Sequence, residues 1–153
     1  MTTQQCLTKL SKKSLTIACA ESISGGALAF ECVRHAGASK VFKGGIIAYH
    51  PEIKIRQLGI SRQDITAYGI VSAEIAVQMA QSIRTLYQAD IGLATTGNAG
   101  PSTQEGVGRR EAWIAIVTPD TTITKHLVFE RETRLQAIKK TVDTTYQKLL
   151  ETI

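Results

Sequence analysis

Hydrophobic and polar residues alternate along the chain in a pattern that predicts helices and strands in regular succession. A continuous apolar run at 15–20 is typical of a strand covered on both faces, and the stretch at 90–95 predicts another strand. Shorter apolar stretches at 44–49, 111–118 and 121–129 predict three more strands. Apolar residues at helical spacing predict helices at 3–12, 24–36, 61–68, 73–86 and about 133–150, and Pro51 favours the start of a further short helix.

The order of these elements predicts the fold class. Early strands alternate with helices, and Pro119-Asp120 is a tight-turn signal that makes the last two strands an antiparallel pair. We therefore expect an α/β fold, a three-layer α/β/α sandwich with a mixed, mostly parallel five-stranded sheet. With 153 residues and neither a repeat nor a linker, the chain is expected to form a single domain over 1–153.

The amino-acid composition indicates in which cellular environment the protein is expected to occur. The three cysteines, Cys6, Cys19 and Cys32, lack CxxC spacing and lie in apolar contexts, which indicates reduced, buried thiols in a cytoplasmic protein. The polar N-terminus and the absence of a long apolar stretch predict no membrane attachment. The histidines, His35, His50 and His126, are isolated, so we expect no metal and no cofactor.

The formal net charge of +5 raises the question of nucleic-acid binding. Basic residues are spread along the chain, and aromatic residues suited to base stacking are few. We expect a small anionic ligand rather than nucleic acid.

The most informative stretch follows the first predicted strand and reads Glu21-Ser22-Ile23-Ser24-Gly25-Gly26. A strand–turn–helix junction is where open α/β proteins bind ligands, because helix N–H groups meet the carboxyl edge of the sheet. Gly25 and Gly26 allow the backbone to approach a ligand closely. A second interpretation stays open, in which Ser22 or Ser24 is only an N-cap of the following helix.

Three polar stretches, 21–26, 49–54 and 95–101, follow predicted strands. If these strands are parallel neighbours, Ser22, Tyr49, Lys54 and Thr96 meet at one edge of the sheet. Lys54 is then the natural base for Ser22 in a Ser–Lys arrangement. Each residue also has a plainer interpretation: a strand-end aromatic ring for Tyr49, a solvated lysine for Lys54, a cap or ion pair for Glu21, and a solvated pair for Arg109-Arg110.

Five stretches in order carry a resemblance to a known family. They are Ala20-Glu21-Ser22-Ile23-Ser24-Gly25-Gly26, Phe42-Lys43-Gly44-Gly45-Ile46-Ile47-Ala48-Tyr49, Lys54-Ile55-Arg56-Gln57-Leu58-Gly59-Ile60, Tyr68-Gly69-Ile70-Val71-Ser72 and Thr96-Gly97-Asn98-Ala99-Gly100-Pro101. The chain resembles the C-terminal domain of the CinA family, which also occurs as stand-alone nicotinamide mononucleotide (NMN) amidohydrolases.

The resemblance implies hydrolysis of the NMN carboxamide to nicotinate mononucleotide and ammonia, a homodimer, and a sandwich with one antiparallel strand. It implies Ser22 as the nucleophile, with Lys54 and Tyr49 as its catalytic partners. The expected substrate-binding residues are Ser24, Gly25, Gly26, Gly45, Thr96, Gly97, Asn98, Gly100 and Arg134.

Several positions depart from the family pattern. His50-Pro51 replaces Ser-Asn, the loop from Ser102 is shorter, and Arg109-Arg110-Glu111 stands where Val-Gly-Thr is usual. Arg134 lacks the Gly-Asp that precedes the family's ligand-binding arginine, which leaves Arg131 as an alternative. These departures keep a second hypothesis open: a nucleotide-binding or regulatory protein that retains the pocket without the activity.

Overall fold

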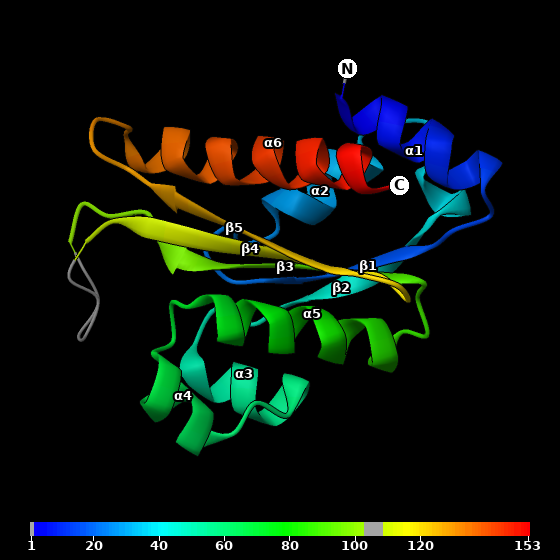
Figure 1. Ribbon diagram of the computed structural model, residues 1–153. Helices are drawn as coiled ribbons and strands as arrows, with labels where there is room; N and C mark the ends of the chain where they lie inside the picture. The colour runs from blue at the N-terminus through cyan, green and yellow to red at the C-terminus, as the bar shows by residue number, and fades with distance from the viewer. Residues whose placement is uncertain (1, 103–108) are drawn as a thin grey trace.

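A computed structural model describes residues 2–102 and 109–153 of the chain. Its centre is one five-stranded sheet in the order β2-β1-β3-β4-β5 (Figure 1). The strands are β1 (Ile17–Glu21), β2 (Phe42–Ile47), β3 (Ile91–Asn98), β4 (Glu111–Val117) and β5 (Thr122–Val128). β1 pairs in parallel with β2 and β3, whereas β4 is antiparallel to β3 and β5. The predicted mixed, mostly parallel sheet is therefore confirmed.

Helices cover both faces of the sheet, as the three-layer prediction requires (Figure 1). One layer contains α1 (Thr2–Lys12), α2 (Ala27–Val33) and α6 (Arg134–Thr152), and the other contains α3 (Pro51–Leu58), α4 (Arg62–Tyr68) and α5 (Ala73–Leu86). A short 3₁₀ helix, η1 (Ala38–Lys40), precedes β2 and was not predicted. Within residues 2–102 and 109–153, no helix combines the length and apolar character that a membrane crossing requires.

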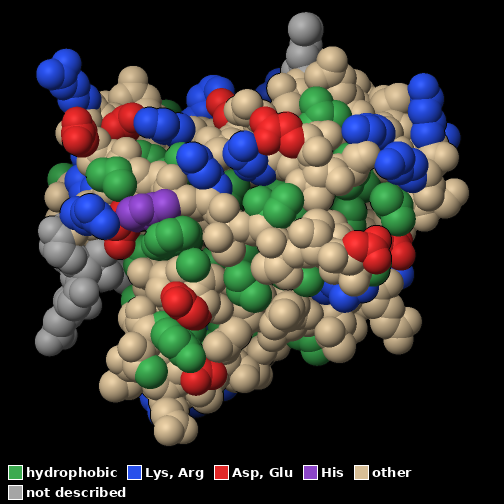
Figure 2. Space-filling model, in the orientation of Figure 1, with side chains coloured by type: hydrophobic (Ala, Val, Ile, Leu, Met, Phe, Trp, Pro, Cys, Tyr) green, Lys and Arg blue, Asp and Glu red, His purple; other side chains and the backbone are tan. Residues whose placement is uncertain are grey.

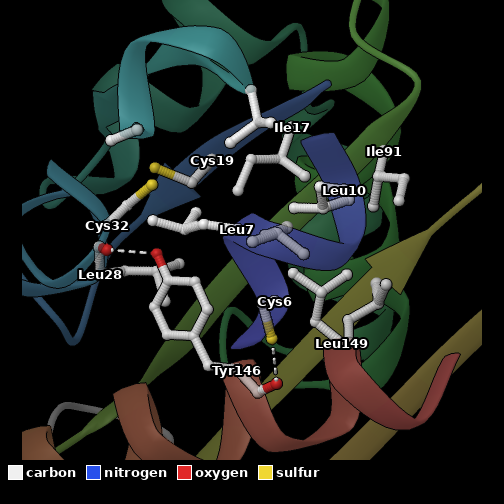
Figure 3. Packing of buried hydrophobic residues seen from close by; sticks show 14 of the residues in the cluster. Cys6, Leu7, Leu10, Ile17, Cys19, Leu28, Cys32, Ile91, Tyr146 and Leu149 are labelled. Atoms are coloured by element: carbon white, nitrogen blue, oxygen red, sulfur yellow. Dashed lines mark hydrogen bonds between the residues drawn. The ribbon is translucent and has the colours of Figure 1, made fainter. Parts of the chain in front are cut away.

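The two faces of β1 belong to different cores, because successive side chains of a strand point to opposite sides. Ile17 and Cys19 pack with α1, α2 and α6 in the core of Figure 3, where the Tyr146 hydroxyl donates to the Leu28 carbonyl at 2.7 Å. Ala18 and Ala20 pack against α5 on the other face. All three cysteines are buried free thiols, as predicted.

Some predicted boundaries are wrong, and tertiary pairing explains the differences. β3 continues through Thr96, Gly97 and Asn98, which were expected in a turn, because β4 pairs with it as far as Asn98↔Glu111. α2 is shorter than the predicted helix at 24–36, since 22–26 form a turn. β2 covers Phe42–Ile47 instead of 44–49. In the loop that starts at Ser102, residues 103–108 lie outside the described residues.

Charged side chains are distributed over the surface seen in Figure 2. Lys and Arg side chains on this face are interspersed with Asp and Glu and do not form one continuous basic patch. Ion pairs at the surface include Lys140–Glu132 at 2.6 Å and Lys148–Glu151 at 2.7 Å.

Candidate active site

The Ser22 hydroxyl lies 2.8 Å from the Lys54 ammonium nitrogen. Ser22 follows the last residue of β1, and Lys54 comes from α3, the helix that follows β2. Both side chains are buried, with exposed fractions of 5% for Ser22 and 1% for Lys54. Burial shows that the solvated-lysine interpretation of Lys54 is wrong. The helix-cap interpretation of Ser22 is also wrong, because the N-cap of α2 is Gly26 and the helix has no side-chain cap hydrogen bond.

The start of α3 directs Lys54 toward Ser22. His50 is the N-cap of this helix, and its Nδ1 accepts a hydrogen bond from the Glu52 N–H at 3.2 Å. Pro51 occupies the first turn, where its missing N–H has no cost. The His50-Pro51 departure from the family pattern thus still starts the helix that carries Lys54.

The environment of Lys54 favours its neutral form. Its Nζ donates to the carbonyls of Ala48 at 2.8 Å and Tyr49 at 3.5 Å, besides contacting Ser22. Burial lowers the pKa of Lys54 from 10.5 to about 8, because removal from water disfavours the charged form. A neutral amine has two N–H groups for the two carbonyls, which leaves its lone pair directed toward the Ser22 hydroxyl.

The turn at 22–26 presents backbone donors next to Ser22. Ser22 N–H donates to the Thr95 carbonyl at 2.9 Å, whereas Ile23 N–H and Ser24 N–H have no hydrogen-bond partner among the described residues. Gly25 and Gly26 have positive φ angles of 55° and 101°, a conformation that glycine adopts without strain. Unpaired N–H groups beside a nucleophile are suited to bind a developing oxyanion.

Tyr49 and Arg134 meet at the carboxyl edge of the sheet. The Arg134 guanidinium, from the first turn of α6, donates to the Gly100 carbonyl at 2.6 Å and to the Tyr49 hydroxyl at 3.1 Å. The Tyr49 ring is 54% exposed. Tyr49 therefore contacts Lys54 through its backbone carbonyl, whereas the Tyr49 hydroxyl accepts a hydrogen bond from Arg134. Arg131 makes no side-chain hydrogen bond within the described part of the chain and is exposed.

The residues of the second glycine-bearing stretch have separate roles. The Thr96 hydroxyl donates to the Ile70 carbonyl at 2.9 Å, so it anchors the segment before α5 rather than Lys54. Asn98 Oδ1 accepts from Gly100 N–H at 3.0 Å, while its buried Nδ2 has no partner among the residues that the structure describes. A Cβ on Gly97 would come within 2.5 Å of the Glu111 carbonyl, so close packing against β4 accounts for this glycine.

Gly45 is explained in the same way, because a Cβ there would come within 2.6 Å of the Cys19 carbonyl. The hydroxyl of Ser24 is buried and bonded to Glu21 and Thr95, on the opposite side of the sheet from Lys54. Neither Gly45 nor the Ser24 side chain has a described hydrogen bond to Ser22 or Lys54. Their expected contacts with the substrate thus remain predictions.

Sequence reasoning missed two side chains that support the site. The Arg110 guanidinium donates to the Ala99 carbonyl at 2.8 Å and to the Glu132 carbonyl at 2.5 Å, which ties the end of β3 to the start of α6. The interpretation of Arg109-Arg110 as a solvated pair is therefore wrong for Arg110, which is half-buried. Thr95 contacts the turn at 22–26, but it lies inside a buried apolar run, where no sequence signal distinguishes it.

These observations define an α/β/α domain with a buried Ser–Lys pair at the carboxyl end of its parallel strands. The chain belongs to the CinA C-terminal domain family, which it matches over residues 1–153.

Individual relatives agree with this assignment. A CinA-like protein from Dictyoglomus thermophilum is 50% identical over 92 residues, which are 60% of this chain and 22% of that relative. The structure of a competence or damage-inducible protein from Enterobacter asburiae is 27% identical, has a TM-score of 0.93, and aligns over 99% of this chain and 95% of that one. The competence/damage inducible protein CihA from Agrobacterium tumefaciens is 25% identical, with a TM-score of 0.92 and coverage of 98% and 92%. The chain spans only 22% to 29% of the length of the curated relatives it matches.

Proposed function

We propose that the protein is an amidohydrolase that cleaves the carboxamide of NMN, with Ser22 as nucleophile and Lys54 as general base. The observation that carries the proposal is the 2.8 Å contact between Ser22 Oγ and a buried Lys54 whose pKa is about 8. A lysine with this pKa is partly neutral near neutral pH and can accept the serine proton. The choice of NMN rests on the family resemblance.

The first half of the reaction forms an acyl-enzyme. Ser22 Oγ bonds to the carboxamide carbon while its proton passes to Lys54 Nζ. The free N–H groups of Ile23 and Ser24 stabilise the negative oxygen of the tetrahedral intermediate. The C–N bond then breaks, Lys54 returns the proton to the departing nitrogen, and ammonia leaves with the acyl group bound to Ser22.

The second half releases the acid. Water attacks the ester carbon and gives its proton to Lys54, the bond to Ser22 Oγ breaks, and the oxygen regains a proton from Lys54. The product is the carboxylic acid, which ionises in water. Each proton thus passes through the same Lys54 nitrogen, so one residue serves as base and as acid in both steps.

Arg134 is the residue that we assign to the phosphate of NMN. It lies between Gly100 and Tyr49 at the same edge of the sheet as Ser22, and two of its N–H groups are used in those contacts. A guanidinium has five N–H donors, so three remain for an anion. Tyr49 and Gly100 hold this planar group in place.

The test is ammonia release from NMN by the purified protein, with nicotinamide, nicotinamide riboside and NAD as comparison substrates. We expect release from NMN and none from Ser22→Ala. Binding of NMN without ammonia release in the wild-type protein would reject the enzyme and favour a nucleotide-binding protein. The motivation for that alternative is the unusual sequence before Arg134.

A further inference from the structure

A chain of hydrogen bonds lies behind Ser22, on the opposite face of the sheet from Lys54. Glu21 and Ser22 are consecutive, so their side chains point to opposite sides, toward α2 and α3 respectively. Ser24 Oγ lies 2.7 Å from Glu21 Oε1 and 2.7 Å from Thr95 Oγ1. The Thr95 hydroxyl is also 3.4 Å from Ser22 N–H, and its carbonyl accepts that N–H at 2.9 Å.

The acceptor role of Glu21 determines the direction of the hydrogen bonds in this chain. Glu21 Oε1 accepts the backbone N–H groups of Gly26 at 3.1 Å and Leu28 at 2.8 Å, and Oε2 accepts that of Ala29 at 3.1 Å. Backbone N–H groups can only donate, so both oxygens of Glu21 are acceptors. The carboxylate also caps α2, whose N-cap Gly26 has no side chain to do so.

The remaining directions follow from this acceptor. The Ser24 hydroxyl must donate to Glu21, so it can only accept from the Thr95 hydroxyl. The Thr95 oxygen in turn keeps its lone pairs for Ser22 N–H. Glu21, Ser24 and Thr95 are 1%, 3% and 0% exposed, so water cannot replace a lost member of the chain.

We propose that Thr95 is a positioning residue that holds the turn at 22–26 in the geometry the reaction needs. This role rests on the function proposed above. Thr95 fixes the turn at two points, at Ser22 through its carbonyl and at Ser24 through its hydroxyl. Between these points lie the Ser22 hydroxyl and the free backbone N–H groups, whose mutual placement determines attack and oxyanion binding.

Thr95→Val tests the role of the hydroxyl, because valine keeps the shape and the backbone contact and removes one link of the chain. Thr95→Ser restores the hydroxyl, and Ser24→Ala removes the same link from a residue outside the strands. Thr145→Val is the matched control, since Thr145 is also 0% exposed and its hydroxyl donates within α6, to the Thr141 carbonyl at 2.8 Å.

Two readouts separate positioning from folding. A fluorophosphonate probe reports the reactivity of Ser22 by mass spectrometry, and NMN kinetics report kcat and KM. We expect Thr95→Val and Ser24→Ala to lower both the labelling rate and kcat about 10- to 100-fold, because small misplacements of reacting groups have effects of this size. KM should change less than about twofold, and Thr95→Ser should recover most of kcat.

The outcomes distinguish the two proposals. Labelling and kcat of Thr95→Val equal to those of Thr145→Val would overturn the positioning role and leave the proposed function intact. A wild-type protein that neither labels at Ser22 nor releases ammonia would overturn the proposed function, and the positioning role with it. If Thr95→Val does not fold, Ser24→Ala and Thr95→Ser decide the question.

Discussion

At the scale of single residues, Ser22 and Lys54 are proposed to act as one catalytic unit. Removing either member leaves the other without a reaction partner, so Ser22→Ala and Lys54→Met should each reduce kcat by about 10³-fold or more. The double variant should be little worse than either single one. Ammonia release under saturating NMN measures these losses. A double variant whose loss equals the product of the single losses would contradict a shared step.

The pH dependence of the rate tests the state of Lys54 directly. Burial lowers the pKa of Lys54 to about 8, and only the neutral amine accepts the serine proton. The rate of ammonia release should therefore be low in acid, rise through about pH 8 and level off above it. A rate that is constant between about pH 6 and about pH 10 would contradict a lysine base.

Arg134 provides a test of the substrate. Arg134→Ala should raise KM for NMN about 10- to 100-fold, because a charge-assisted contact to phosphate is lost, and should change KM for nicotinamide riboside little. Arg131→Ala is the matched control, since it removes an arginine three residues away whose side chain makes no described hydrogen bond. Equal effects of Arg134→Ala on both substrates would show that Arg134 does not bind the phosphate.

The sequence was sufficient to predict that Ser22 and Lys54 lie together. It was not sufficient to predict the hydrogen-bond partners of Tyr49 and Thr96. The pairing followed from topology, because residues after parallel strands meet at one edge whatever their side chains contact. The hydroxyl of Tyr49 instead contacts Arg134, and that of Thr96 contacts the Ile70 carbonyl. Such partners depend on where α6 and the segment before α5 pack, which local periodicity does not encode.

At the scale of secondary-structure elements, local signals predicted α5 well and β3 less well. Ser72 caps α5 by accepting from Ile75 N–H at 3.3 Å, and the apolar face of the helix was visible in the sequence. The end of β3 was placed too early, because Thr96-Gly97-Asn98 looks like a turn. Its pairing with β4 depends on residues more than ten positions away. Strand ends are therefore determined by tertiary partners that a single sequence does not reveal.

The packing of α5 on β3 yields a stability prediction. A Cβ on Gly92 would clash with the Ala80 carbonyl of α5, so Gly92→Ala should lower the free energy of unfolding by about 2 kcal/mol or more. Gly37→Ala is the comparison, because Gly37 has open space and only a positive φ of 89°, which costs about 1 kcal/mol. Urea unfolding of both variants measures the difference. Equal losses would show that helix and strand separate easily at Gly92.

At the scale of the whole molecule, the fold class was predictable because layer order follows from the order of elements. The oligomeric state, in contrast, does not follow from the order of the elements. The homodimer remains an expectation from the family resemblance, because a surface contact with a second copy leaves no periodic signal. Exposed apolar side chains such as Phe30 and Leu135, at 65% and 75%, are compatible with several partners and identify none.

Lys54 also links the proposed chemistry to global stability. Its pKa is about 8 in the folded protein and 10.5 when unfolded, so between these values the unfolded chain binds more protons. The free energy of unfolding therefore rises with pH through this interval, and this gain from the deprotonation of Lys54 is absent below about pH 8. Lys54→Met removes the titration and leaves the other groups, which makes it the reference protein.

We expect the free energy of unfolding of the wild-type protein to increase relative to Lys54→Met as the pH rises from about 8 to about 10, by roughly 1–3 kcal/mol. Urea unfolding of the two proteins across this range measures the difference, in which shared titrations of cysteine and tyrosine cancel. A constant difference would mean that Lys54 keeps an ordinary pKa when folded. A wild-type protein that loses stability relative to the variant would mean that the folded state favours the ammonium. Either result would remove the physical basis for Lys54 as a base. The expected rise would show that the same burial of Lys54 lowers the stability of the fold near neutral pH and favours the neutral amine that the reaction requires.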